Sequence, residues 1–244
     1  MKTEKLLIVP DVHGRTFWKE SVYNWDGNIV FLGDYLDPYP DEDISFNTAL
    51  RGLKDIIELK EANPDRITLL LGNHDVHYIW EEAPVSTRFS RMFEDEVATL
   101  FNDYRPDFQV AKMIEQDGKF FLLTHAGLVK GWFDQNGLTV PEKTEVEDML
   151  NKMAETHKGK AMLSQIGYSR WGDSPSGGPM WADFFEDHRL DYPIIPDVYQ
   201  IVGHTGSVYR YDEQACMKKN IACIDRRKTY ILEGGKLKNA IGEN

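Results

Sequence analysis

The sequence has few cysteines, no long apolar run and no excess of positive charge, and each absence excludes a class of protein. Its two cysteines, Cys216 and Cys223, are too few for a disulfide framework in 244 residues, and they lack the spacing of a zinc knuckle. No stretch approaches the ~20 apolar residues of a membrane span. The early apolar run, residues 6–9, is too short for a signal peptide. We therefore expect a cytoplasmic protein with reduced thiols and no membrane association.

Positive charge is scarce, because 28 Lys and Arg stand against 40 Asp and Glu and the net charge is −12. Such a chain repels phosphate backbones, so nucleic acid is not an expected partner. Part of the acidic excess can instead consist of metal ligands. Hydrophobic residues make up 41% of the sequence, which allows a large core. We expect a single domain over residues 1–244, with a loop-rich insertion around residues 130–197.

Short apolar runs alternate with helical patterns over the first 75 residues. Strands are predicted at residues 6–9, 28–32 and 67–71, with a short helix at 16–23 and a longer one from Phe46 to Asn63-Pro64. This alternation indicates an α/β fold with a largely parallel sheet. Later patterns predict helices at 86–104 and 142–157, a hairpin of strands 108–114 and 119–123, a loop at 164–197, a strand at 198–202 and a terminal hairpin around Gly234-Gly235.

Each apolar strand is followed by side chains that can bind a metal ion. In open α/β sheets, ligands lie beyond the carboxyl ends of the strands, so we expect these side chains to meet in one crevice. The flanking glycines let the backbone turn sharply there. The five motifs are Asp11-Val12-His13-Gly14, Gly33-Asp34-Tyr35-Leu36-Asp37, Gly72-Asn73-His74-Asp75, His125-Ala126-Gly127 and Gly203-His204-Thr205.

The residue types in these motifs predict two divalent cations. Carboxylates together with imidazoles suit manganese above all, with iron, zinc, nickel or magnesium as alternatives. Asp11 and His13 face the same side of an extended strand and can bind one ion. Asp34 can bridge both ions with its two oxygens. The second ion is expected to be held by Asp34, Asn73, His125 and His204.

Two such ions about 3.5–4 Å apart can acidify a bridging water and hold a phosphate ester for in-line attack. The leaving oxygen then needs a proton. His74 is expected to donate it, since Asp37 can orient a histidine and raise its pKa.

Taken one at a time, these residues also have structural explanations. Asp11 and His13 are common types in surface loops, and His74 can cap a helix. Asp75 is expected to form a turn, with a supporting contact behind the metal ligands as the alternative. His125 or His204 could likewise be a satisfied core histidine. His77 and His188 are expected to be structural or solvated, and His157 to be inert on an exposed helix. The aromatic residues of the long loop are expected to anchor it in the core rather than to form a stacking platform; they are Trp171, Trp181, Phe184 and Phe185.

The order of the five motifs resembles the calcineurin-like metallophosphoesterase superfamily. The resemblance implies a two-sheet α/β/β/α sandwich with a dimetal site at the carboxyl ends of the strands. It assigns Asp11, His13 and Asp34 to one metal, with Asp34 shared by both. It assigns the general acid and its partner to His74 and Asp37, and the second metal to Asp34, Asn73, His125 and His204.

Two departures from the family pattern bear on the substrate. Many phosphodiesterase members end in Gly-His-x-His, whereas this chain reads Gly203-His204-Thr205-Gly206, which is similar to the phosphoprotein phosphatase and diadenosine tetraphosphatase branch. That branch has a phosphate-binding arginine directly after Gly-Asp-x-x-Asp, and Pro38 stands there instead. Arg15 and Arg170 are therefore candidates for binding phosphate.

Three functional hypotheses follow. The first is a phosphatase that acts on phosphomonoesters, either small molecules or phosphoproteins, including a protein Ser/Thr phosphatase. The second is a phosphodiesterase or a dinucleoside polyphosphate hydrolase. The third is a scaffold without activity, which the presence of all six metal-binding side chains disfavours. No pattern indicates an oligomeric state.

Overall fold

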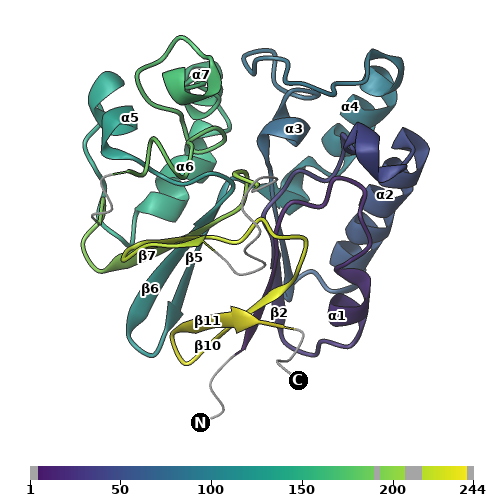
Figure 1. Ribbon diagram of the computed structural model, residues 1–244, viewed down its shortest axis with the longest axis horizontal. Helices are drawn as coiled ribbons and strands as arrows, with labels where there is room; N and C mark the ends of the chain where they lie inside the picture. Colours follow the sequence, from purple (N-terminus) through teal and green to yellow (C-terminus); the bar gives the residue numbers. More distant parts are fainter. Residues whose placement is uncertain (1–4, 190–192, 207–215, 241–244) are drawn as a thin grey trace.

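The computed structural model describes residues 5–189, 193–206 and 216–240, and its strands form a six-stranded and a five-stranded sheet (Figure 1). The first sheet has the order β11 (Lys236–Asn239), β10 (Tyr230–Glu233), β1 (Leu6–Val9), β2 (Asn28–Phe31), β3 (Ile67–Leu70) and β4 (Phe108–Gln109). The second has the order β5 (Ala111–Gln116), β6 (Lys119–Thr124), β7 (Val198–Val202), β9 (Ile221–Cys223) and β8 (Cys216–Met217).

Helices cover the outer faces of both sheets, so the predicted α/β/β/α sandwich is confirmed. Figure 1 shows one set of helices on each side of the pair of sheets. The first set comprises α1 (Lys19–Tyr23), α2 (Phe46–Ala62), α3 (Asn73–Val76) and α4 (Glu94–Asp103). The second comprises α5 (Lys130–Gln135), α6 (Val146–Met153) and α7 (His157–Leu163).

The central strands of the first sheet, β1, β2 and β3, are mostly apolar at successive positions because both of their faces are buried. Leu7 packs in the cluster on the helix side, which also contains Leu53 of α2. Leu6 and Ile8 point the other way and join Leu123 of β6 in a cluster between the sheets. Full burial of such a side chain contributes about 1.5–3 kcal/mol. The alternation of side chains along a strand thus fixes which residues join the sheets together.

Helix α2 confirms the prediction made from its apolar period. The Ser45 hydroxyl accepts a hydrogen bond from the Thr48 backbone N–H (3.1 Å) and caps the first turn. The helix ends at Ala62, because Asn63 precedes a proline and leaves the helical conformation. Its buried face consists of Ala49, Leu50, Leu53, Ile56 and Ile57.

Three other predicted helices differ in extent. In place of the helix expected at residues 16–23, the structure has only the shorter α1. In place of the one expected at 86–104 it has α4, which begins at Glu94. The helix expected at 142–157 is interrupted between α6 and α7. The Thr156 hydroxyl caps α7 by accepting from the Gly159 N–H, and a Cβ at Gly159 would lie 2.1 Å from the Met153 carbonyl oxygen. The close packing of α7 on the end of α6 therefore enforces the break.

The strand expected at residues 108–114 is divided between the two sheets. Phe108 pairs with Leu69 in the first sheet, whereas Ala111 pairs with Thr124 in the second. The Asn151 Oδ1 atom accepts a hydrogen bond from the Ala111 N–H (3.2 Å) at the crossing. A sequence period does not reveal this change of sheet, because both halves remain extended.

Both predicted hairpins are present. Gln116 pairs with Lys119 around Asp117-Gly118, where both turn residues have positive φ (52° and 71°). Glu233 pairs with Lys236 around the second turn, Gly234-Gly235. Strands β8 and β9 were not predicted; β9 lies between β7 and β8 in the second sheet.

The expected insertion is loop-rich in its second half only. Residues 130–163 contain α5, α6 and α7, whereas the described part of 164–197 contains one short 3₁₀ turn, Tyr168–Arg170. Phe184 is buried as expected, but Trp171 is 95% exposed, so its expected place in the core is wrong. The single-domain assignment stays a prediction.

Among the described residues, none of the helices combines the length and the apolar character that a membrane crossing requires. The cytoplasmic location stays a prediction.

Candidate dinuclear metal centre

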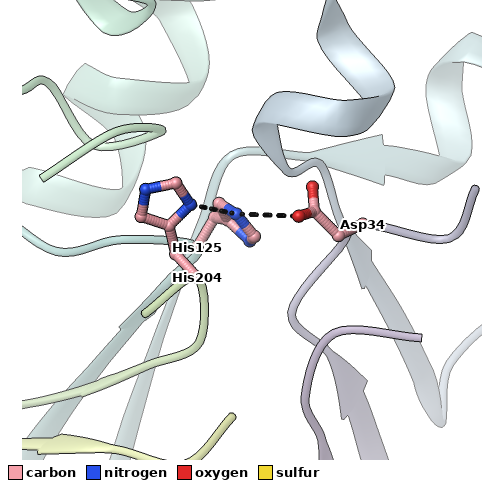
Figure 2. A group of neighbouring side chains, drawn as sticks. All are labelled: Asp34, His125 and His204. Carbon is pink, nitrogen blue, oxygen red and sulfur yellow. Dashed lines mark hydrogen bonds and ion pairs between the residues drawn. The ribbon is translucent and has the colours of Figure 1, made fainter. Parts of the chain in front are cut away.

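The carboxyl ends of strands from both sheets meet at one edge of the sandwich. Figure 2 shows Asp34, which follows β2 of the first sheet, facing His125 and His204, which follow β6 and β7 of the second. Asp11 and Asn73 follow β1 and β3 and are 1% and 2% exposed. The predicted convergence of strand ends is therefore present in the fold.

A first group of possible ligands comprises Asp11, His13 and Asp34, whose ligand atoms all lie within 4.8 Å of one another. The His13 Nδ1 atom lies 2.8 Å from the Leu36 carbonyl oxygen, which can only accept, so the ring proton is on Nδ1. Burial lowers the pKa of His13 well below its usual value, which keeps the ring neutral. Its Nε2 lone pair then faces Asp34 Oδ2 at 3.4 Å, an arrangement that a cation stabilises.

A second group comprises Asp34, His125 and His204, again with ligand atoms within 4.8 Å of one another. The His125 Nδ1 atom contacts the Leu32 carbonyl oxygen (2.9 Å), which can only accept, so in the tautomer with its one proton on Nδ1 the Nε2 atom is an acceptor. This Nε2 lies 2.9 Å from Asn73 Oδ1, which is also an acceptor. The His204 Nδ1 atom lies 2.9 Å from the same Oδ1. A cation bound by these atoms would remove the repulsion between them, so the donor set fits a metal ion.

Asp34 belongs to both groups through one oxygen rather than two. Its Oδ1 atom accepts a hydrogen bond from the His74 backbone N–H (2.8 Å). Its Oδ2 atom faces His13 Nε2 at 3.4 Å and His125 Nε2 at 3.5 Å. In this arrangement Oδ2 lies between the two groups, and the bridging of two ions by Asp34 stays a prediction.

Asp75 does more than form the turn that the sequence suggested. Its carboxylate accepts the Gly72 N–H (2.8 Å) within its own turn. It also accepts the N–H groups of Asp34 (2.7 Å) and Tyr35 (3.0 Å) from the neighbouring loop. Asp75 therefore holds the loop with the shared carboxylate, where Asp34 has a positive φ of 53°.

Two glycines leave space for the ligand carboxylates. A Cβ atom at Gly203 would lie 2.0 Å from Asp11 Oδ1, and one at Gly72 would lie 2.2 Å from Asp34 Oδ1. The Asp11 carboxylate in turn accepts the His204 backbone N–H at 3.0 Å. These positions need glycine because backbone and carboxylate approach each other directly.

The buried carboxylates at this edge require positive charge. Burial and then the neighbouring Asp11 raise the pKa of Asp34 well above its usual value. Burial, and after it the charge of Asp11, also raises the pKa of Asp225 to about 7. Asp225 follows β9 and was not predicted, although it repeats the pattern of a strand that ends in a carboxylate. Divalent cations would stabilise the ionised form of this cluster.

His74 and Asp37 form the predicted pair beside the metal ligands, with 2.8 Å between Nδ1 and Oδ2. Burial lowers the pKa of His74 to about 4 despite Asp37, so the expectation of a raised pKa is wrong. Burial alone raises the pKa of Asp37, but hydrogen bonds from His74 and His77 outweigh it and the pKa is lowered.

His77, which was expected to be structural or solvated, is structural, because it contacts Asp37 from the interior of the protein. Its Nε2 atom lies 2.9 Å from Asp37 Oδ2, and its side chain is fully buried. The Tyr78 hydroxyl donates to Asp37 Oδ1 at 2.6 Å. Asp37, His74 and His77 lie close enough to hold an ion, but these hydrogen bonds already occupy the carboxylate.

The sequence profile of the calcineurin-like phosphoesterase family matches residues 5–207. The chain belongs to this family. It is therefore a metal-dependent phosphoesterase, a hydrolase that cleaves phosphate esters, and its buried Asp and His groups are ones that could hold metal ions.

Among solved structures, this phosphoesterase is similar to a protein serine/threonine phosphatase from Saccharomyces cerevisiae, itself described as similar to human phosphatase PP5. The match has a TM-score of 0.55 and 14% sequence identity, and it covers 96% of this chain and 74% of that chain. No curated protein matches the sequence significantly. The structural match therefore concerns the fold.

The two arginines predicted to bind phosphate in this phosphoesterase both have carboxylate partners. Arg15 Nε donates to both carboxylate oxygens of Glu42 at 2.8 and 3.0 Å. Arg170 Nε lies 2.8 Å from Asp183 Oδ2, and its NH2 group donates to Thr205 Oγ1 (2.9 Å). Both guanidinium groups lie near the centre, since they lower the pKa of His13 and His204 after the larger effect of burial.

Sequence reasoning missed Arg88, which lies in the loop after α3 and belongs to no motif. Its Nε donates to the Asp37 carbonyl oxygen (3.0 Å), and its NH2 group lies 3.1 Å from His74 Nε2. Its guanidinium lies 3.7 Å from the centre of the Tyr39 ring. Among the residues that the structure describes, no carboxylate forms an ion pair with Arg88. No local pattern in the sequence marks this residue, whose backbone has a positive φ of 69°.

Proposed function

We propose that this phosphoesterase hydrolyses phosphomonoesters, including the phosphoserine and phosphothreonine side chains of proteins. The observation that carries the proposal is Arg88, a guanidinium without a described carboxylate partner, beside His74 and the metal ligands. A phosphomonoester has nearly two negative charges and three terminal oxygens at neutral pH. A guanidinium can bind two of those oxygens at once, and it replaces the arginine that Pro38 displaces.

The metal ligands are proposed as two sets that share Asp34. One set is Asp11, His13 and Asp34, and the other is Asp34, Asn73, His125 and His204. Manganese is the proposed ion, with iron, zinc, nickel and magnesium as alternatives for this mixed oxygen and nitrogen donor set. When bound, such ions neutralise phosphoryl charge and lower the pKa of a coordinated water.

His74 is proposed to donate the proton to the leaving oxygen. Its Nδ1 faces Asp37, which fixes the orientation of the ring, and its Nε2 faces Arg88. Since Nε2 faces the N–H donor of Arg88, the proton to be donated must first be taken up on Nε2. The negative charge of a phosphate bound by Arg88 would favour this protonated ring, and the Nε2 proton can then pass to the ester oxygen of the leaving group. General acids in such positions contribute about 10²–10⁴ in rate.

Two features bear on the substrate class. The last motif lacks the second histidine of the phosphodiesterase pattern, which disfavours a diester. The similarity of the fold to a protein serine/threonine phosphatase supports a protein substrate. The complete set of buried metal ligands disfavours an inactive scaffold.

A substrate panel tests the proposal. We expect p-nitrophenyl phosphate and a phosphothreonine peptide to be hydrolysed in the presence of Mn²⁺, and bis-p-nitrophenyl phosphate and diadenosine tetraphosphate to be hydrolysed more slowly. Metal content is measured in parallel by mass spectrometry and compared after loading with each of the five ions. Faster turnover of the diester by fully loaded protein would contradict the proposal.

Arg88 is tested separately. Arg88→Ala is expected to lower kcat/KM for p-nitrophenyl phosphate by about 10²–10³, because a preorganised donor to the phosphoryl group is lost. Arg88→Lys should restore only part of this loss. Metal content should not change. The matched control is Arg91→Ala, which removes an exposed arginine three residues away. Equal rates for Arg88→Ala and Arg91→Ala would exclude phosphate binding by Arg88.

A further inference from the structure

A groove of about 890 Å³ lies at the end of the second sheet opposite to the metal centre. It includes the first residues of β6 and β7, whereas His125 and His204 follow the last ones. The length of β6 separates the two sites by about 16 Å at about 3.3 Å per residue. The turn of the β10–β11 hairpin forms another wall, and Figure 1 shows this hairpin beside the amino end of β6. The groove is therefore separate from the site that holds the reacting phosphate.

The groove concentrates positive charge in an acidic protein. Lys119, Lys143 and Lys236 line it, and none of them forms an ion pair with a carboxylate in the part of the chain that the structure describes. Because the chain has 40 Asp and Glu residues against 28 Lys and Arg, its composition does not lead one to expect three lysines without a described carboxylate partner on one surface. Lys218 and Lys219 line the groove as well, and Asp197 is the one described acidic residue among its walls. This charge favours an anionic occupant.

The aromatic rings of the groove are already engaged, which disfavours a nucleotide. Lys143 Nζ lies 4.1 Å from the centre of the Phe120 ring. The Tyr199 hydroxyl donates to the Lys218 carbonyl oxygen (3.2 Å), and its ring packs edge-on against Phe121. A nucleobase would need a free aromatic face for stacking. The groove also lacks arginine among its described residues, so it has no group that can bind phosphate through two parallel hydrogen bonds.

Two sheet edges border the groove, which favours an extended peptide. Within the described residues, β8 is the last strand of the second sheet and β11 is the last strand of the first. Met217 of β8 lines the groove and is 58% exposed, and Leu237 of β11 lines it as well. Sheet edges can pair with an added strand, whose alternate side chains then point to the groove and to solvent.

We propose that this groove binds an acidic, extended segment of a partner protein, with carboxylates at Lys119, Lys143 and Lys236 and an apolar side chain at Met217. The proposal does not depend on the substrate of the metal centre. Docking of a partner at this distance would hold it on the enzyme without occupying the active site.

Fluorescence anisotropy tests the proposal on the full chain. The probe is a labelled peptide in which glutamate alternates with valine, and the comparison peptide has glutamine in place of glutamate. We expect the acidic peptide to bind and the glutamine peptide to bind at least about tenfold more weakly, with affinity that falls as salt rises. The triple variant Lys119→Gln, Lys143→Gln, Lys236→Gln should bind the acidic peptide more weakly than the parent protein does, by a similar factor. Its hydrolysis of p-nitrophenyl phosphate should not change.

The matched control is Lys54→Gln, Lys130→Gln, Lys152→Gln, which makes the same change in net charge on surfaces outside the groove. Equal loss of binding in both triple variants would show attraction by net charge alone and would overturn the proposal. Binding of inorganic polyphosphate but not of the acidic peptide would also overturn it. Met217→Ser should weaken binding without a change in its salt dependence, and an unchanged affinity would exclude the apolar contact.

Discussion

At their carboxyl ends, β6 and β7 present His125 and His204 to a buried cluster of carboxylates, whereas at their amino ends they border a groove lined with solvent-accessible lysines. Burial distinguishes the two ends. The carboxylates lose hydration and have raised pKa values, so they need cations nearby. The lysines keep their hydration and need no ion pair. One pair of strands thus supports a site for metal ions and a surface suited to an anionic partner.

The largest effect should follow from removing the charge shared by the two metal groups. Asp34→Asn is expected to lower metal content and to reduce turnover by about 10³ or more, since metal ions supply several kcal/mol of transition-state stabilisation. Metal analysis and p-nitrophenyl phosphate kinetics check this. The control Asp65→Asn removes an exposed carboxylate. Full metal content in Asp34→Asn would contradict the assignment of Asp34 as a ligand of both metal ions.

Replacing the proposed acid should separate proton donation from metal binding. His74→Asn is expected to lower turnover by about 10²–10⁴ on a substrate with a poor leaving group, and metal content should not change. The loss should be smaller on p-nitrophenyl phosphate, whose leaving group needs less protonation. His157→Asn, at an exposed histidine far from the centre in sequence, should behave as the parent protein does. Parent rates for His74→Asn on the poor leaving group would refute the assignment.

A smaller effect is expected when one methyl group is added at Gly203, which packs against the carboxylate of Asp11. Gly203→Ala places a Cβ atom where Asp11 Oδ1 lies 2.0 Å away, so the carboxylate must move. We expect metal affinity to fall by about 10–100-fold, as for other changes that disturb the orientation of a ligand. Titration with Mn²⁺ measures it. Gly52→Ala, at a helical position where an added Cβ meets no atom within 4 Å, should leave metal affinity unchanged.

The smallest effect concerns a histidine outside both sites. Burial lowers the pKa of His188 to about 4, so the folded protein keeps this ring neutral while the unfolded chain takes up a proton below about pH 6.5. Stability should therefore fall as the pH decreases from 6.5 to 4, by on the order of 2–3 kcal/mol from this residue.

The variant His188→Gln cannot be protonated and should lose that part of the pH dependence. Urea unfolding of metal-free protein at pH 7 and pH 4.5 measures the difference. An identical pH dependence in both proteins would show that His188 does not contribute. Its Nε2 atom contacts the Ala126 carbonyl oxygen at 3.1 Å, a hydrogen bond that glutamine can replace.

Much of the metal centre could be predicted because each of its ligands follows an apolar strand in a short motif. Asp11, Asp34 and Asn73 lie two or three residues after the ends of β1, β2 and β3, so the parallel arrangement of the strands is enough to bring them to one edge. The same reasoning applies to His125 and His204 after β6 and β7. Asp225 after β9 was missed because its strand has only three residues and no predicted partner.

The phosphate-binding side of the site could not be predicted in the same way. Arg88 lies in a loop without a motif, and only folding brings it to within 3.1 Å of His74. The lysine-lined groove also forms only on folding, because its walls come from segments that are distant in the sequence, such as residues 118–121 and 235–237. No local pattern describes such a neighbourhood.

The sequence by itself determined the alternation of strands and helices and the candidate metal ligands at the ends of the strands, because apolar period and motif order are local properties of the chain. The tertiary structure decided which oxygen of Asp34 lies between the two groups of candidate ligands, that burial rather than Asp37 dominates the pKa of His74, and which arginine is left without a described carboxylate partner. Those properties depend on distances and on exclusion of water. Both arise only when the two sheets pack together.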